Sequence, residues 1–307
     1  MRHHSTVAAA LSLIACTFVG ATSAQQAGPS SPVQQGSGAP AEGGQGRQGG
    51  EGGAGRQGGA GRGNAPSLPA PRWPDGRINL GAPAGEKGVW ERRNEHLVTN
   101  PNSYQAPATR SARVHIDQVP LQPWAKALTD DRHRSALASE PYTRCKPSGG
   151  PRQMMSPYGV EFVDLPELRR IYVFNVANAL TYRTIYMDGR EHPKTLTPSH
   201  LGHSVGRWEG DTLVIDTVGF NEDFWMNRDA LPHTSQLHLT ERLTRTNFDT
   251  LNYEVTIDDP GAYTAPWTSG YTLGWQKDNE LFEYQCQQNN LSPESMAGDS
   301  LISPITP

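Results

Sequence analysis

A surplus of basic residues is missing from this chain of 307 residues, in which 27 Lys and Arg stand against 31 Asp and Glu, for a formal net charge of −4. Nothing in this balance points to a nucleic-acid partner. Long apolar runs are missing as well, because the run over residues 7–19 is too short to cross a bilayer comfortably. Cysteine is scarce, with three residues, and the zinc motif HExxH does not occur. We therefore expect no nucleic-acid partner and no transmembrane segment.

Residues 1–24 have the features of a secretory signal, with Arg2 near the start, an apolar run and small residues before residue 25. Leu13-Ile14-Ala15-Cys16 also fits a bacterial lipobox, in which Cys16 would carry a lipid anchor. The apolar residues that continue past the cysteine favour free secretion over lipidation. We predict a secreted or periplasmic protein, with a membrane-anchored lipoprotein as the alternative.

Once such a signal is removed, Cys145 and Cys286 are the only cysteines left. Export to an oxidising compartment makes a disulfide between them reasonable. The bridge would close a loop of about 140 residues, a constraint on the unfolded chain of roughly 3 to 5 kcal/mol. Two buried free thiols are the alternative interpretation.

The chain divides into segments of different composition. Residues 25–70 form a Gly-rich stretch that repeats GRQGG and has too few apolar residues for a core, so we predict a disordered linker. Residues 71–145 read as an irregular arm with one helix over 122–141, which begins at Pro123 and is stopped by Pro141. Residues 146–290 form the expected β domain, and 291–307 a tail.

The β domain is predicted from a change to period-two alternation after residue 159, with turn residues between short runs. Nine runs fit strands: VEFVDL, RRIYVFNV, LTYRTIYM, HSVGRW, DTLVIDTV, QLHLTERLTRT, TLNYEVTID, SGYTLGW and ELFEYQC. A barrel or a strongly curved sheet closes such a meander without long exposed edges. We therefore predict a mainly β fold, an antiparallel β-barrel of lipocalin type with a short helical N-terminal arm.

Residues 202–206, GHSVG, satisfy the G-x-S-x-G pattern that many serine hydrolases use to present a nucleophile. That role requires a strand before the serine and a helix directly after it. Here Pro198 lies shortly before the motif, and Arg207-Trp208 leads into a Glu-Gly-Asp turn and another strand. We therefore expect a hairpin and keep a serine hydrolase using Ser204 only as a minor alternative.

Four motifs occur together in this chain: PDG at residues 74–76, GHSVGRWEGDTLV-D-T-GF at 202–220, PH-x-x-x-LH-x-x-ER at 232–242, and EVTIDDP-x-Y-x-x-PW at 254–267. In these motifs the chain resembles a family of exported bacterial proteins, over most of residues 71–290. The resemblance implies export and a common fold. It carries no reaction, so the functional hypotheses depend on individual residues.

Ionisable residues interrupt the apolar alternation of three predicted strands. Glu241 shares a face with leucines, Arg183 with Ile185, and Asp216 with valines. If these faces point inward, Arg183 should pair with Glu241 or Asp216, because an unpaired buried charge costs several kcal/mol. Two interpretations stay open, a structural ion pair or polar groups in an apolar pocket that bind ligand or transfer protons.

Histidines supply the candidate acid–base groups. We predict that His203, His233 and Glu241 are catalytic, with His238 at the same site and a carboxylate that orients the imidazole. The neighbouring histidines could instead bind zinc, but their spacing fits no known metal motif, so we expect neither a metal nor a cofactor.

Further ligand-binding candidates are Arg207, which could hold a carboxylate or a sugar hydroxyl, and Trp225 and Trp267, which could stack on a ligand ring. Pairing of Arg207 with Glu209 or Asp211, and core packing of the tryptophans, are the structural alternatives. The hypothesis is a metal-independent lyase, isomerase or hydrolase with a pocket for a small molecule or glycoside. A non-catalytic binder of an apolar or aromatic ligand is the alternative.

Overall fold

The computed structural model describes residues 67–93, 95–99, 111–135, 138–176, 180–284 and 286, which all belong to one compact unit spanning Arg62–Pro307. The predicted signal segment with Cys16, almost all of the Gly-rich linker and the predicted tail lie outside the described residues. Within these ranges, no helix combines the length and the apolar character that crossing a membrane requires.

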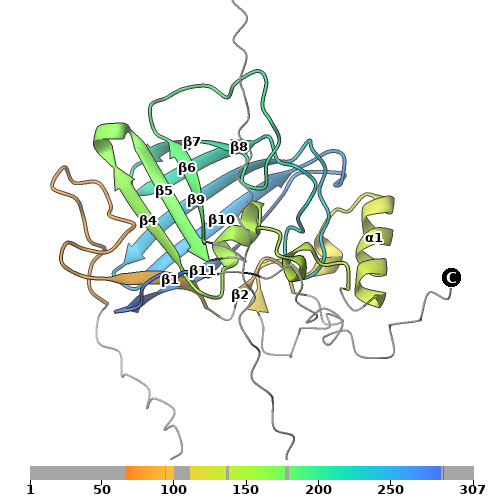
Figure 1. Ribbon diagram of the computed structural model, residues 1–307, viewed down its shortest axis with the longest axis horizontal. Coiled ribbons are helices and arrows are strands. Elements are labelled where there is room, and N and C mark those ends of the chain that lie inside the picture. Colours follow the sequence, from red (N-terminus) through yellow and green to blue (C-terminus); the bar gives the residue numbers. More distant parts are fainter. Residues whose placement is uncertain are drawn as a thin grey trace, which may run out of the picture. The chain divides into compact units, whose positions relative to one another are not determined.

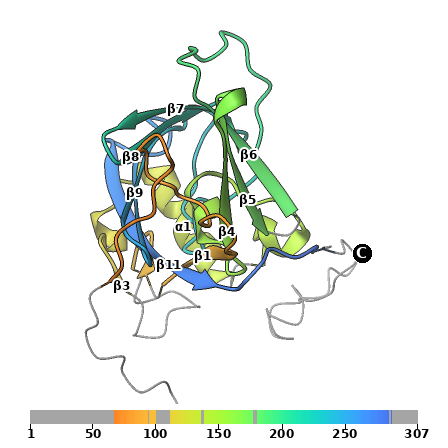
Figure 2. The same cartoon turned by 90° about the vertical axis from the view of Figure 1, so that its left-hand side faces the viewer.

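In the described part of the chain, nine strands form a closed barrel in the order β1-β11-β10-β9-β8-β7-β6-β5-β4, seen from two directions in Figures 1 and 2. They are β1 (Gly88–Arg92), β4 (Val160–Leu165), β5 (Arg170–Val176), β6 (Leu180–Tyr186), β7 (His203–Glu209), β8 (Thr212–Val218), β9 (His238–Asn247), β10 (Thr250–Asp258) and β11 (Trp267–Lys277). A separate small sheet pairs β2 (Glu95–His96) with β3 (Ser111–Ala112). The mainly β fold and the barrel predicted from the alternation are confirmed.

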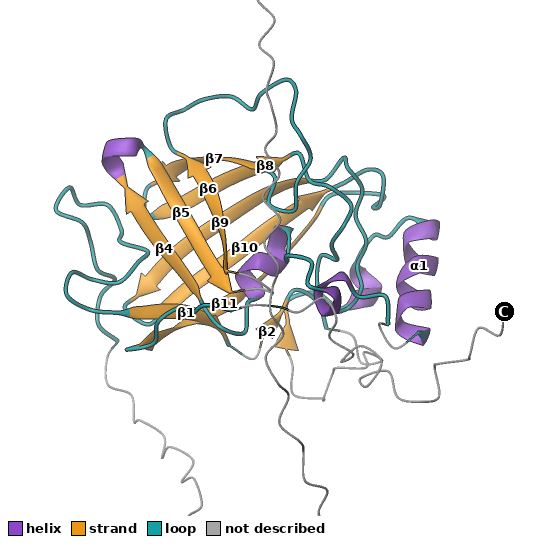
Figure 3. Ribbon diagram, viewed as in Figure 1, coloured by secondary structure: helices purple, strands orange, loops and turns teal. Residues whose placement is uncertain are grey.

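Helical segments are short and lie around the strands, as the purple ribbons of Figure 3 show. They are η1 (Ile116–Gln118), α1 (Pro123–Arg134), η2 (Pro141–Arg144), η3 (Gly150–Met155) and η4 (Pro166–Leu168). The predicted helix is α1, which has a proline in its first turn as expected but ends at Arg134, before the predicted stop at Pro141. It buries Ala125 and Thr129, whereas Trp124 is 45% exposed and donates its indole N–H to the carbonyl of Gly261.

Eight of the nine predicted strands are barrel strands, and the ninth differs. The run ELFEYQC at residues 280–286 is not a strand where the structure describes it, and its aromatic rings at Phe282 and Tyr284 pack on Tyr158. β1 takes its place, pairing with β11 along its whole length and with β4 through Trp90. The arm predicted for residues 71–145 therefore contributes a strand to the barrel.

The barrel is not antiparallel throughout. β6 and β7 run parallel and share only the register pairs Ile185↔Ser204 and Tyr186↔Val205. A long connection over residues 187–202 makes this parallel step possible, and it rises as the green loop above β6 and β7 in Figure 1. The β6–β7 seam is consequently much shorter than the ladders on either side of it.

The barrel interior is filled by side chains and closed at both ends. At one end all residues of η3 are buried, and the carbonyl of Pro151 accepts a hydrogen bond from the Tyr271 hydroxyl. At the other end Arg245, which is 2% exposed, donates to the carbonyls of Asn79, Gly81 and Phe248. Burial lowers the pKa of Arg245 to about 10. The segment before β1 is thereby fixed over the barrel end.

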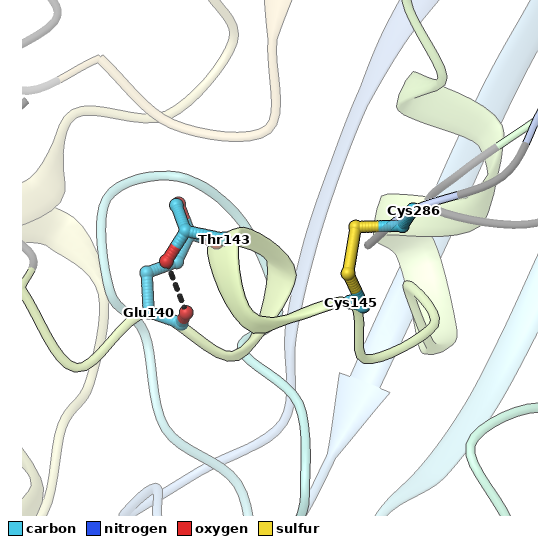
Figure 4. Close-up of a disulfide and its surroundings, with 4 residues drawn as sticks. All are labelled: Glu140, Thr143, Cys145 and Cys286. Atoms are coloured by element: carbon cyan, nitrogen blue, oxygen red, sulfur yellow. Dashed lines mark hydrogen bonds between the residues drawn. A yellow bond between two sulfur atoms is a disulfide. The ribbon is translucent and has the colours of Figure 1, made fainter. Parts of the chain in front are cut away.

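Cys145 and Cys286 are joined in a disulfide across a sequence separation of 141, with their Cα atoms 5.5 Å apart (Figure 4). Cys145 ends η2, whose first turn is held by a hydrogen bond from the Thr143 hydroxyl to the carbonyl of Glu140. The predicted pairing is confirmed, although Cys286 follows the last strand and is not part of it.

Candidate functional site

A polar network lies inside the barrel, where period-two alternation turns Arg183, Ser204, Thr217 and Glu241 inward. The Arg183 guanidinium donates to both carboxylate oxygens of Glu241, to Ser204 Oγ at 2.8 Å and to Thr217 Oγ1 at 2.6 Å. The Tyr253 hydroxyl donates to Glu241 Oε1 at 3.0 Å. One arginine of β6 thus bonds to side chains of β7, β8 and β9.

This network is cut off from solvent, because Glu241 is 0% and Arg183 3% exposed. Burial by itself lowers the pKa of Arg183, but the Glu241 carboxylate outweighs it and the net shift is upward. Burial, with the Glu241 charge added, also raises the pKa of Tyr253, so this phenol stays neutral and donates. A closed, charge-balanced ion pair is structural in character, which matches one of the two interpretations left open by the sequence.

The GHSVG motif is explained by packing. Ser204 is 1% exposed, sits within β7 and accepts the bond from Arg183, and a strand follows it where a nucleophile would need a helix. Gly202 has a φ of 63°, and a Cβ there would lie 2.7 Å from the carbonyl oxygen of Val218. A Cβ on Gly206 would lie 2.5 Å from Met187 Sδ. The glycines are required by close approach of neighbouring strands.

A second polar cluster lies on the outer face of β7, β8 and β9, and we call His192, His203, Asp216 and His238 the histidine–aspartate cluster. His192 Nε2 is 2.8 Å from Asp216 Oδ1, and His238 Nε2 is 2.8 Å from Asp216 Oδ2. His203 Nδ1 is 2.8 Å from His192 Nδ1, and the His203 ring stacks on Tyr186 of β6. Three residues singled out in the sequence therefore meet at one place.

Asp216 lies outside the barrel, whereas one expectation from the sequence placed it in the interior with Arg183 and Glu241. Leu213, Ile215 and Thr217 are the inward residues of β8, so the alternation turns Asp216 outward. The valines beside it made that face look like the core face in the sequence. Asp216 instead accepts hydrogen bonds on the outer surface, where its side chain is 29% exposed.

His192 was not among the predicted site residues. It comes from the irregular 187–202 connection, where no periodicity indicates which way a side chain points. Its ring lies between His203 and Asp216 and hydrogen-bonds to both. The sequence shows only a histidine before Pro193, and its role depends on how the barrel closes.

The charges of the cluster follow from its surroundings. Partial burial raises the pKa of Asp216, but hydrogen bonds from His238 and His192 outweigh it, so the pKa is lowered overall. Partial burial, together with the nearby His192 and Arg190, lowers the pKa of His203. Near neutral pH the carboxylate is therefore ionised and the His203 imidazole neutral, which leaves His203 able to accept a proton.

The cluster is arranged as a chain and not as a cage. His192 uses Nδ1 toward His203 and Nε2 toward Asp216, so its partners lie on opposite edges of one ring. A tetrahedral zinc site needs its ligand atoms to converge on one point. Among the described residues, no group of three or more His, Cys, Asp or Glu side chains is placed to hold a metal ion.

The three residues predicted to be catalytic are not brought together. Glu241 points into the barrel and His203 outward, on opposite faces of the same wall. His233 lies in the connection between β8 and β9, 5% exposed, with its ring 4.0 Å from that of Phe224 and Nε2 3.0 Å from the Phe224 carbonyl oxygen. A common acid–base site of these three residues is thus not supported by the geometry.

Burial lowers the pKa of His233, more than its hydrogen bonds to the carbonyls of Thr234 and Phe224 raise it. A histidine whose pKa is lower in the folded state binds its proton more readily when unfolded. Stability is therefore lost as pH falls through the unfolded value of about 6.5. We expect the free energy of unfolding to fall between about pH 7 and pH 5, and His233→Gln to flatten that slope in urea titrations. Equal slopes in both proteins would contradict this assignment.

The other predicted ligand-binding residues have structural partners. Arg207 pairs with Glu209 at 2.7 Å on the exposed outer face, which is the structural alternative that the sequence offered for this residue. Trp225 is 3% exposed beneath the Arg132 guanidinium, 4.5 Å from the ring centroid. Trp267 is buried beside Tyr263. None of these three joins the histidine–aspartate cluster through a described hydrogen bond or ring contact.

Comparisons with known protein families, with curated proteins and with solved structures found no match to this chain.

Proposed function

We propose that the protein is an exported enzyme that transfers protons to and from a small molecule or glycoside at the histidine–aspartate cluster. The observation that carries this proposal is the hydrogen-bonded chain from His203 through His192 to Asp216, whose carboxylate also accepts from His238. A carboxylate that orients an imidazole is a recurring element of acid–base sites. The signal-like start of the chain and the disulfide support export.

The proton positions follow from which groups can accept. An ionised carboxylate only accepts, so the Nε2 atoms of His192 and His238 carry the protons that face Asp216. When His192 is neutral, its Nδ1 has a lone pair and accepts from His203 Nδ1. His203 then has its free lone pair on Nε2, and this atom is the base of the proposed site.

Proton uptake would move charge along the chain. When His203 Nε2 takes a proton from a substrate, its Nδ1 proton can pass to His192 Nδ1, which leaves His203 neutral again. The positive charge then lies on His192, beside the Asp216 carboxylate. Reversal of the two transfers returns the proton to a leaving group, so one site serves as base and as acid.

Asp216→Asn tests the chain because it removes the charge that stabilises protonated His192. We expect turnover to fall by about 100-fold or more, in keeping with the usual contribution of a general acid or base. Turnover is sought by proton NMR with a panel of small glycosides, esters and carbon acids. Nitrogen-15 NMR of the imidazoles should show His203 protonated on Nδ1 and unprotonated on Nε2 near neutral pH.

The matched control is Glu209→Gln, which removes an exposed carboxylate of the same outer face that bonds to Arg207 and Arg242. It should leave turnover unchanged. The proposal fails if turnover survives in Asp216→Asn, or if the His203 proton is found on Nε2 in the resting protein.

A further inference from the structure

Aromatic side chains gather on the outer face of β5 and β6, two of the green strands in Figure 1. Period-two alternation turns Tyr172 and Phe174 of β5 outward, and Tyr182 of β6 lies opposite Phe174. The centroids of the three rings lie 5.9 to 6.2 Å apart, and we call these residues the aromatic patch. Tyr182 is 59% exposed and the other two side chains are half-buried, so the patch faces solvent.

The aromatic patch is larger than pairing within the sheet requires. Contact between directly opposite side chains stabilises an antiparallel pair, which accounts for Phe174 against Tyr182. Tyr172 lies opposite Thr184, yet its ring contacts both other rings. Apolar groups that gather on a solvent-facing surface mark binding surfaces, whereas single exposed ones do not. Aromatic rings of this kind can stack on the apolar faces of sugar rings.

Tyr186 connects the aromatic patch to the histidine–aspartate cluster. It lies on the same outer face of β6, four residues after Tyr182, which is about 13 Å along the strand. The pair of Tyr172 and Thr184 fills the space between them. The Tyr186 ring stacks on His203, with centroids 5.1 Å apart. The patch and the base of the proposed site therefore share one continuous stretch of the barrel wall, long enough for a short oligosaccharide.

Two arginines lie beside this stretch. The guanidinium carbon of Arg190 is 4.0 Å and that of Arg170 is 5.4 Å from the centroid of the Tyr186 ring. Arg190 donates to both carboxylate oxygens of Asp188, which compensates its charge. In the described part of the chain, no carboxylate pairs with Arg170. One guanidinium beside the patch is thus left to bind a carboxylate of a ligand, whose two oxygens match its fork of donors.

We propose that the aromatic patch binds an acidic oligosaccharide, a sugar chain with uronic acid residues, and that Arg170 holds one of its carboxylates. Sugar rings would stack on the patch, and the chain would reach His203 along the outer face of β6. This names the substrate class of the site proposed above and rests on that function. A neutral sugar would leave Arg170 without a partner, and a carboxylate without sugar rings would leave the patch unused.

The test is isothermal titration of the full chain with tetrasaccharides of galacturonate, glucuronate and mannuronate. We expect saturable binding of at least one of them. Methyl esterification of its carboxyl groups should weaken binding about fivefold, which corresponds to the loss of an exposed ion pair. Poly-glutamate of similar charge carries no sugar rings and should bind more weakly than the uronate.

Tyr182→Ala should weaken binding of that tetrasaccharide about tenfold, because it removes the most exposed ring of the aromatic patch. Tyr172→Ala serves as a second variant. Arg170→Gln should bind the acid and its methyl ester equally. The matched controls are Trp124→Ala, which removes an exposed ring of α1, and Arg113→Gln, which changes an exposed arginine beside β10. Both should bind like the wild type.

The melting temperature reports whether each variant is folded. The proposal is overturned if none of the three tetrasaccharides binds, or if poly-glutamate binds as tightly as they do. It is overturned as well if folded Tyr182→Ala and Tyr172→Ala both bind like the wild type, or if Arg170→Gln still distinguishes the acid from its ester. Asp216→Asn should lose turnover and keep the affinity of the wild type, so failure of binding is distinct from failure of proton transfer.

Discussion

Replacing Glu241 by Gln should lower the free energy of unfolding by about 3 to 5 kcal/mol, because it leaves the buried Arg183 guanidinium without its counter-charge. Both side chains are closed from solvent, so water cannot take the place of the lost carboxylate. Tyr253 loses part of its acceptor as well, since its hydroxyl donates to the same group. Urea unfolding monitored by tryptophan fluorescence gives the value directly.

The control is Glu209→Gln, which breaks exposed ion pairs and should cost no more than about 1 kcal/mol. A double-mutant cycle with Arg183→Met isolates the pair, and replacing both partners should cost less than the sum of the single changes. A stable Glu241→Gln protein that loses turnover would instead show that Glu241 takes part in the chemistry, as the sequence hypothesis had it.

Replacing Cys145 and Cys286 by serine should cost roughly 3 to 5 kcal/mol at 25 °C, because the reduced chain gains the freedom of a loop of about 140 residues when it unfolds. The bridge also joins η2 to the segment that packs on Tyr158. Cys145→Ser alone should lose as much as the double variant, since either change removes the bond. Unfolding curves with and without reductant measure the effect.

Mass spectrometry after alkylation of the denatured protein checks the bond itself. With reductant, Cys145 and Cys286 should both be alkylated. Without reductant, neither should be. If both residues are labelled in the unreduced protein, the stabilisation must come from another source.

The barrel could be predicted because period-two alternation is strong over the long strands from β4 to β11. The same pattern failed at ELFEYQC, since alternation indicates a strand only if a sheet edge is available to pair with it. β1 occupies that edge beside β11. Which strand closes a barrel is decided by long-range pairing, and a short window of sequence does not contain that information.

The candidate site was predictable to a different degree for each residue. The rule that buried charges must be paired anticipated Arg183 with Glu241 as one of two options. The face of Asp216 was misjudged, because Val214 and Val218 lie with it on the outer face of β8, where apolar residues resemble a core-facing row. His192 could not be found, since its place depends on the path of an irregular loop.

The barrel is a ring with two short seams, because β1 and β4 share one register pair and β6 and β7 share two. Few register pairs must separate at either seam while the long ladders stay intact, and the β6–β7 seam is the one that lies beside the histidine–aspartate cluster. Inside the barrel, Arg183 of β6 bridges that seam by its hydrogen bond to Ser204 of β7. On the outside, the ring of His203 of β7 stacks on Tyr186 of β6. Opening of the β6–β7 seam would part His203 from Tyr186, whereas His203, Asp216 and His238 would stay together on the continuous β7–β8 and β8–β9 ladders.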